Sequence, residues 1–136
     1  MAAIIIKDAF VSVGATDISA HVTSVEIPFD RDEKEVTAMG DNSKTRIKGL
    51  KDGSVQINFN LDAGRVVDAL FWTEYLSDAV TAVVVRSDSG SVSATNPQYA
   101  GNVMVLEFNP ISGTVGDNHA SSVTWPASGD WARTTS

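Results

Sequence analysis

Cysteine is absent from this chain, and its absence excludes disulfides, thiolate metal sites and cysteine nucleophiles. Long apolar runs are lacking as well. The apolar stretch within residues 1–8 is too short for a signal peptide and has no basic leader. No segment reaches the roughly 20 apolar residues that a membrane-spanning helix needs. We therefore expect a soluble protein with no export signal and no membrane partner.

The chain also has no excess of positively charged residues. The formal net charge is -7, which argues against a protein that grips nucleic acid through its phosphates. The length of 136 residues suits one domain with a sizeable apolar core. With 43% hydrophobic and 20% charged residues, the composition indicates an ordinary globular protein and not a disordered one.

Residues that carry catalytic chemistry are scarce. The two histidines, His21 and His119, lie far apart in the sequence and have different neighbours. Ser121 and Asp117 near His119 suggest a serine nucleophile with its base, but no G-x-S-x-G turn presents a serine. We interpret His21 as a structural strand residue and His119 as a surface loop residue, so we predict no enzyme and no catalytic residue.

Two polar segments superficially resemble ligand-binding loops. Residues 40–45 resemble a phosphate loop, but they lack the second glycine before Lys44 and a following helix. Residues 30–35 resemble a calcium loop, but the turn glycine and the distal glutamate are missing, and Arg31 would compete for the carboxylates. We therefore predict no metal site and no cofactor.

Alternation of apolar and polar residues dominates the segment 23–61. After an exposed loop, four apolar residues alternate with three uncharged amides: Val55, Ile57, Phe59 and Leu61 with Gln56, Asn58 and Asn60. A period of two puts each set on its own face of a sheet. An amide face without Lys or Glu suits contact with another protein surface or with a polar lumen. The pattern predicts a building block of a larger assembly.

The remaining pattern predicts a mainly β fold with one helix. We expect strands at 9–13, 21–29, 34–39, 52–62, 81–86 and 99–108, and a final strand formed by 114–115 and 121–125. The acidic cluster 30–33 is expected as a hairpin tip, and loops are expected at 40–48 and 88–97. The apolar spacing from Val66 to Tyr75 predicts an amphipathic helix, with Asp62 as its N-cap, held by packing on the sheet. Trp72 and Trp125 are expected in or near the core.

These elements predict a β-sandwich or barrel subunit with a flanking helix. We expect a β-domain over 1–126 and a C-terminal tail over 127–136. Trp131 lies in this Ser/Thr-rich tail. We interpret it as an anchor on a neighbouring subunit, because aromatic residues dominate interface energetics; the alternative is a tail folded back on its own domain.

Charged residues of opposite sign lie close together on one strand–loop–strand unit. The acidic group is Asp30, Asp32 and Glu33, and the basic group is Lys44, Arg46 and Lys48. If copies stack head to tail, the two groups would meet across the joint and fix its register. The alternative is that both groups belong to ordinary charged loops.

Several motifs in this order resemble the major tail tube proteins of long-tailed, siphovirus-type phages. They are VEIP at 25–28, EVTAMGD at 35–41, KGLKDGSVQINF at 48–59, YAGNV at 99–103, VGD at 115–117 and VTWPASG at 123–129. Each motif alone is degenerate. Their order, the single mid-chain helix and the size of the domain give the resemblance its weight, and together the motifs cover most of the chain.

The resemblance implies a structural virion protein whose hexameric rings stack into a tail tube, the conduit for DNA ejection. Inner strands of six subunits would close a barrel and remove exposed sheet edges. It further implies tape measure, tail terminator and distal tail proteins as partners, assembly in the host bacterial cytoplasm, and DNA that passes without specific binding. The alternative function is a capsid decoration or a receptor- or glycan-binding module.

A lumen lined by carboxylates and amides would repel DNA phosphates and let the DNA slide. The candidate lumen acids are Glu26, Glu35 and Glu107, which lie on expected strands. The alternative for each of them is a position on the outer wall of the tube.

Overall fold

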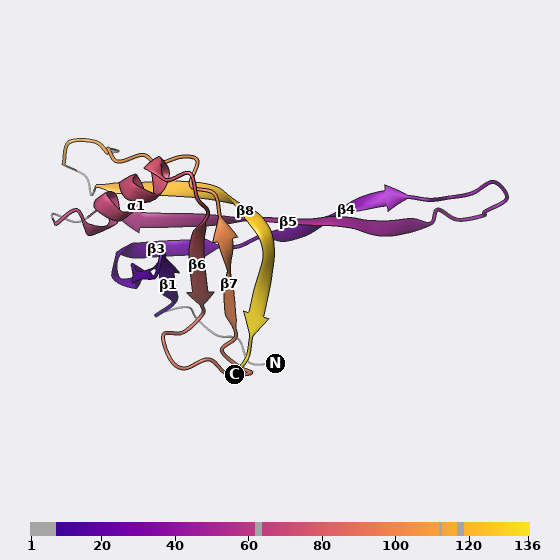
Figure 1. The fold of residues 1–136 in the computed structure, drawn as a ribbon, viewed down its shortest axis with the longest axis horizontal. Helices are drawn as coiled ribbons and strands as arrows, with labels where there is room; N and C mark the ends of the chain where they lie inside the picture. Colours follow the sequence, from indigo (N-terminus) through magenta and orange to yellow (C-terminus); the bar gives the residue numbers. More distant parts are fainter. Residues whose placement is uncertain (1–7, 62–63, 112, 117–118) are drawn as a thin grey trace.

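A computed structural model describes residues 8–61, 64–111, 113–116 and 119–136 of the chain. Asp62 and Asp117, which entered the predictions above, lie outside these residues. The described elements are β1 (Phe10–Val13), β2 (Thr16–Asp17), the short 3-10 helix η1 (Ser19–His21), β3 (Val22–Glu26), β4 (Phe29–Glu35), β5 (Arg46–Asn60), α1 (Val66–Leu76), β6 (Thr81–Arg86), β7 (Gln98–Val103) and β8 (Ala120–Thr134). Their arrangement is drawn in Figure 1.

The strands form one antiparallel sheet in the order β2-β1-β6-β7-β8-β5-β3, with β4 attached to β5 outside this path. The long strand β8 joins two parts of the sheet. Its first half pairs with β5, and its second half pairs with β7. In Figure 1, β8 bends between these two directions, so the sheet curves like part of a barrel wall. The expected mainly β fold with one helix is confirmed.

The core lies between the concave face of the sheet and α1. The predicted alternation in β5 is confirmed, because Val55, Ile57 and Phe59 are fully buried while the residues between them are not. Trp125 of β8 is fully buried beside them. The ring of Phe71 on α1 meets the rings of Phe59 and Trp125 edge-on, with centroids 5.1 and 5.0 Å apart. This aromatic contact holds the helix on the sheet.

The helix and several strands lie where the sequence predicts them. The observed helix runs from Val66 to Leu76 and buries Val67 and Phe71. Strands β1 and β6 match the expected 9–13 and 81–86. The prediction that Trp72 lies in or near the core was wrong, because half of its surface is exposed and its ring stacks on Tyr75. Consecutive helical residues point in different directions, so Phe71 and Trp72 do not share a face.

The most prominent difference from expectation is a long ribbon that leaves the body of the molecule (Figure 1). Strand β4 pairs with the first half of β5, from Phe29 opposite Gly53 to Glu35 opposite Arg46. We call residues 29–53 the arm and residues 36–45 its tip. The acidic cluster 30–33, expected as a hairpin tip, lies within β4, and residues 34–39 do not pair with β3. The prediction was wrong because both faces of the arm are exposed, so no apolar period marks its strands.

Other strand boundaries also differ. β5 begins at Arg46, within the expected loop 40–48 and before the expected start at residue 52, and residues 114–115 form no strand. The expected strand 21–29 is divided into η1, β3 and the start of β4, with a break at residues 27–28. The expected strand 99–108 ends at Val103. Residues 127–134, expected as part of a tail, continue β8 alongside β7. Backbone pairing with β7 extends β8 through a segment whose Ser, Gly and Thr content indicates a loop.

Candidate functional site

The arm is the most exposed part of the described chain. Every residue of β4 is exposed, and no residue of the β5 segment 46–53 is buried. Five apolar side chains of the arm are at least about half exposed: Phe29, Val36, Met39, Ile47 and Leu50. A two-stranded ribbon alone is marginally stable in water, and clustered exposed apolar surface marks a contact site. The arm therefore has the properties of an interaction surface.

The arm is anchored where it leaves the body. The ring of Phe29 lies 5.8 Å from that of Trp131 in an edge-on arrangement and 6.3 Å from that of Tyr99. Trp131 lies against Gly101 of β7, where an added Cβ atom would come within 2.4 Å of the indole ring. Opposite Gly101 the register of β7 and β8 shifts, and Gly129 has a φ of +85°. The bulge and the missing side chain make room for the indole.

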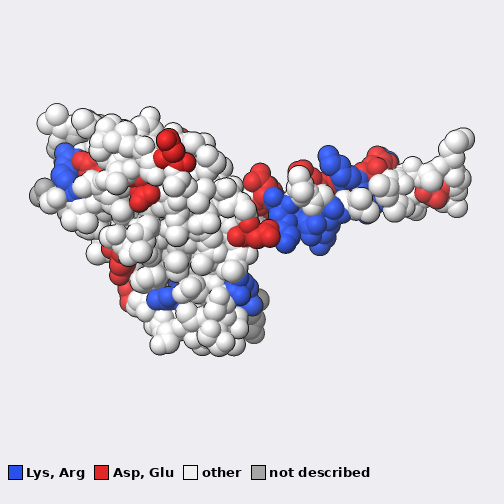
Figure 2. Space-filling model, viewed as in Figure 1, with Lys and Arg blue, Asp and Glu red and all other residues white. Residues whose placement is uncertain are grey.

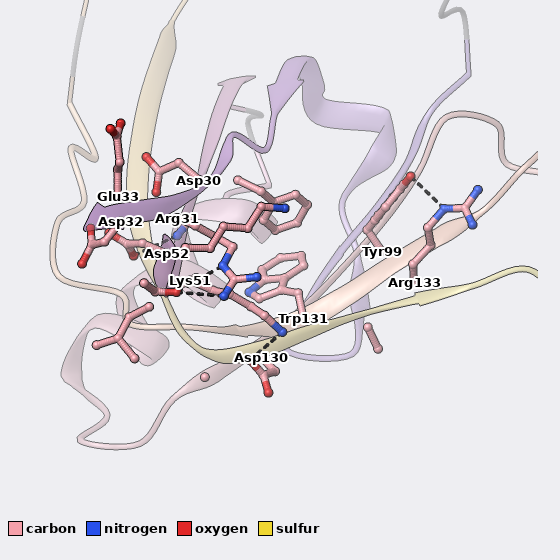
Figure 3. A pocket seen from close by; sticks show the side chains of 18 of the residues that line it. Asp30, Arg31, Asp32, Glu33, Lys51, Asp52, Tyr99, Asp130, Trp131 and Arg133 are labelled. Carbon is pink, nitrogen blue, oxygen red and sulfur yellow. Dashed lines mark hydrogen bonds and ion pairs between the residues drawn. The ribbon is translucent and has the colours of Figure 1, made fainter. Parts of the chain in front are cut away.

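A groove of about 1030 Å³ runs between the arm and the second half of β8 (Figure 3). Phe29 and Trp131 give it apolar lining, and Arg31, Lys51 and Arg133 give it basic lining. The Lys51 Nζ atom lies 3.9 Å from a carboxylate oxygen of Asp130 across the groove. Five acidic side chains also line the groove: Asp30, Asp32, Glu33, Asp52 and Asp130. The groove thus combines aromatic rings with charged groups of both signs.

The register of the arm places like charges opposite each other. Asp30 faces Asp52, and Arg31 faces Lys51. The Nε and Nη2 atoms of Arg31 donate to the carbonyl of Gly49 at 3.2 and 2.9 Å, where the register of the two strands shifts. Like charges on directly opposite residues destabilise a sheet. The arm tolerates this arrangement twice in succession.

The predicted inter-ring residues lie together, with one exception. Asp30, Asp32 and Glu33 lie in β4, Lys44 lies in the tip, and Arg46 and Lys48 lie in β5. Figure 2 shows acidic and basic side chains gathered on the half of the arm nearer the body. Glu33 and Arg46 form an ion pair within the arm. One member of the acidic group and one member of the basic group are therefore already paired inside a single chain.

Trp131 is the exception, because it lies in β8 at the base of the arm. It is half-buried and packs against the core of its own chain. In the single chain, Trp131 therefore lies as the alternative describes, folded back on its own domain. A contact of Trp131 with a neighbouring subunit stays a prediction.

The three predicted lumen acids are not brought together. Glu26 ends β3 and lies opposite Gln56, and Glu35 ends β4 on the arm. Glu107 was expected within the strand 99–108, but it lies after the end of β7 at Val103. Its carboxylate accepts the Thr124 N–H at 2.8 Å, and its carbonyl accepts the indole N–H of Trp125 at 3.0 Å. Glu107 thus covers an edge of β8, while a lumen position of any of the three stays a prediction.

The described residues carry few other functional signals. His21 lies in η1 and His119 lies just before β8. No three His, Asp or Glu side chains among the described residues are placed to hold a metal ion, and no helix in this part of the chain is long and apolar enough to cross a membrane. The carboxylate of Asp17 accepts hydrogen bonds from the hydroxyl and the backbone N–H of Ser19, at 2.5 and 2.9 Å. These bonds hold the pKa of Asp17 below its ordinary value.

Sequence reasoning missed the partners that define the base of the arm. Arg31, Lys51, Gly101 and Tyr99 were not singled out as site residues. The available signal was the pair of glycines at 49 and 53 within a charged segment, because glycine in a strand marks a bulge or a close approach of another group. Gly101 follows the same rule opposite Trp131.

Comparison with known proteins gives a clear result for the fold. No family model and no curated protein matches the sequence. A chain of the virion of a native gene transfer agent particle matches with a TM-score of 0.77 and 14% identity, covering 97% of this chain and 99% of that chain. Two chains from an extracellular contractile injection system (PVC) also match, both from the extended state. One belongs to the sheath-tube complex, with a TM-score of 0.66, 13% identity and coverage of 98% and 93%. The other belongs to the sheath/tube terminator, with a TM-score of 0.67, 14% identity and coverage of 98% and 98%.

These likenesses extend over nearly the whole of each chain. They confirm the expected fold, a curved β sheet with one helix of the type found in phage tail tube-like proteins.

Proposed function

We propose that this chain is the structural subunit of a phage-type tail tube, in which hexameric rings stack around a central channel. The observation that carries the proposal is the arm. It leaves the body with both faces exposed, and no described strand pairs with its outer edges. A ribbon of this kind needs cover from another surface to be stable, and further copies of the chain supply that cover in a stacked tube.

The edges of the sheet support the same assembly. β3 ends the sheet on one side and the two-residue strand β2 ends it on the other. Exposed edges invite pairing with other chains, and closure into a barrel removes them. In a hexameric ring, the curved sheets of six copies would follow one another around the channel. The likeness to a chain of a sheath-tube complex supports this arrangement.

The polar face of β3, β5 and β8 suits a channel wall. One row joins Glu26, Gln56 and Thr124, and the next joins Ser24, Asn58 and Ser122. The Asn58 amide donates to the Ser24 hydroxyl at 3.1 Å. These rows carry amides, hydroxyls and one carboxylate, so they offer no cation to hold a DNA phosphate. We assign this face to the lumen, with Glu26 as its acid.

The proposed function places the protein in a virion, assembled in the cytoplasm of the bacterial host. A tape measure protein would occupy the channel during assembly, and terminator and distal tail proteins would meet the two ends of the tube. DNA would pass without specific binding. The protein would have no catalytic role, so exchange of both His21 and His119 would leave the infectivity of particles unchanged.

The test is negative-stain microscopy of the purified full chain at increasing concentration. We expect rings with sixfold end views and tubes of one diameter. A chain that stays monomeric at every concentration would contradict the proposal. Rings that never stack would instead favour a terminal or decorating position in the particle.

A further inference from the structure

We infer that the arm carries an acidic and a basic face at its base, and that the basic face of one copy receives the acidic face of the next copy. This inference rests on the proposed function, because it names the contact between neighbouring subunits. We call residues 29–31 and 51–53, where the ribbon leaves the body, the arm root. The partner is a second copy of this chain.

The two faces follow from the register of the strands. Directly opposite residues of an antiparallel pair share a face, and consecutive residues of a strand alternate between faces. Asp30 and Asp52 are opposite each other, so both carboxylates lie on one face of the arm root. Arg31 and Lys51 are the next opposite pair, so both cations lie on the other face. Figure 3 shows Arg31 and Lys51 on the side of Trp131, with Asp30 pointing away from it.

The acidic face has no counter-charge within the described part of the chain. Asp30 takes part in no ion pair or side-chain hydrogen bond among these residues, and the Asp52 carboxylate accepts only the backbone N–H of Gly53, at 2.8 Å. The two carboxylates therefore repel each other with nothing between them to offset the repulsion.

The basic face is also poorly compensated. The hydrogen bonds of Arg31 go to the uncharged carbonyl of Gly49. Lys51 is 3.9 Å from Asp130, and both side chains are mostly exposed, so this pair is weak. The Arg31 and Lys51 pair thus retains its positive charge at the wall of the groove.

A second copy resolves both repulsions with one contact. Because each arm root carries both faces, a contact between the basic face of one copy and the acidic face of another can repeat around a ring or along a stack. The groove that Arg31 and Lys51 line offers about 1030 Å³ and the rings of Phe29 and Trp131 to an incoming arm root, and Asp30 and Asp52 border the same groove. A nucleic acid would neutralise only the basic face, and it would approach a chain with a net charge of -7. A second copy neutralises both faces.

The test reverses each face separately in the full chain. Protein D30K/D52K has two basic faces and protein R31E/K51E has two acidic faces. Since like charges across an interface repel, we expect the protein concentration needed for tube formation to rise by about tenfold or more for either protein alone. An equimolar mixture should assemble near the wild-type concentration, because the two proteins can alternate, and a ring of six permits alternation.

Controls separate this effect from misfolding and from net charge. The arm root lies outside the core, so circular dichroism and the melting temperature of the body should match the wild type. K51E alone keeps the hydrogen bonds of Arg31 to Gly49 and should show a smaller change in the same direction. Protein D78K/D88K has the same net charge as D30K/D52K, with both changes in loops of the body, and should assemble at the wild-type concentration.

The outcomes are distinguishable from those of the proposed function. Wild-type tubes together with unimpaired assembly of both reversed proteins would overturn the two-faced contact and leave the tube function standing. A mixture that assembles no better than its components would overturn the contact as well. Binding of a duplex DNA oligonucleotide that competes with assembly and is lost in R31E/K51E would assign the basic face to DNA instead. Wild-type protein without rings or tubes would overturn the proposed function itself.

Discussion

The body and the arm of this molecule use the same strand in opposite ways. In the body, the segment 54–60 of β5 alternates between buried and unburied residues, and Val55, Ile57 and Phe59 are fully enclosed. In the arm, the segment 46–53 of the same strand buries no residue. Strand structure in the body is therefore stabilised by packing of apolar side chains. Strand structure in the arm depends on pairing with β4 and, in the proposed tube, on the neighbouring copy that would cover it.

Under the proposed function, this contrast divides the chain into a part that determines stability and a part that determines assembly. If the division holds, changes in the body should alter unfolding, and changes in the arm should alter polymerisation without altering unfolding. The predictions below test the division, beginning with the change of largest expected effect.

Removal of the arm should separate the two properties completely. Residues 32–50 are replaced by Asn-Gly, which favours a tight hairpin turn, so that Arg31 and Lys51 flank the new turn. We expect the melting temperature of the body to match the wild type, because the core lies outside the deleted segment. Negative-stain microscopy should show no tubes at any concentration. Tubes of normal diameter would show that the arm is dispensable and that the contrast drawn here is wrong.

Phe71→Ala should have the largest effect on the body. The Phe71 side chain is fully buried and meets the rings of Phe59, Trp125 and Phe108. Replacement of a buried phenylalanine by alanine typically costs about 3–5 kcal/mol. Urea unfolding followed by tryptophan fluorescence would measure the loss. Phe29→Ala at the arm root is the matched control: its ring is half exposed, and a loss as large as that of Phe71→Ala would blur the boundary between arm and body.

Gly101→Ala should have an intermediate effect at the junction of the two regions. The new methyl group would come within 2.4 Å of the Trp131 ring, and overpacking of this kind costs about 1–3 kcal/mol. The double variant G101A/W131A removes the clash. We expect its loss of unfolding free energy to be smaller than the sum of the two single losses, as a double-mutant cycle would measure. Additive losses would mean that the indole and Gly101 do not depend on each other.

Asp17→Asn should have the smallest effect, and it should depend on pH. Hydrogen bonds from Ser19 lower the pKa of Asp17 in the folded chain, so the ionised carboxylate stabilises the fold above the ordinary pKa of an aspartate. This contribution is lost as the pH falls through the lowered pKa. The difference in melting temperature between the wild type and D17N should therefore be present at neutral pH and disappear in acid. Assembly should not change, and a difference that grows in acid would contradict this reasoning.

The sequence predicts the body well because elements with one buried face show a regular spacing of apolar residues. The alternation of Val55, Ile57 and Phe59 and the helical spacing of Val67 and Phe71 both indicate one apolar face. Segments that bury neither face leave no such period. For this reason residues 30–33 of β4 were predicted as a hairpin tip, and the second half of β8, held by backbone pairing with β7 around the bulge at Gly129, was not predicted as a strand.

The sequence predicts which charged residues belong to the candidate site, but not how they are arranged on the faces of the arm. Opposite charges at Asp30 and Lys48 are visible in the sequence, and both lie on the arm. Which charges share a face depends on the register of β4 against β5, and that register shifts between Arg31 and Glu33. A shift of this kind is decided by local backbone geometry, so the like-charge pairs became visible only in the structure.

The continuity of β5 links the orientation of the arm to the packing of the body. Side chains along one strand alternate with a fixed phase, and in β5 this phase is locked where Val55 enters the core. One extra residue inserted between Gly53 and Ser54 would turn each β5 side chain of the arm to the opposite side of the ribbon. The core thereby acts as a template that sets which way the charges of a distant, solvent-exposed projection point.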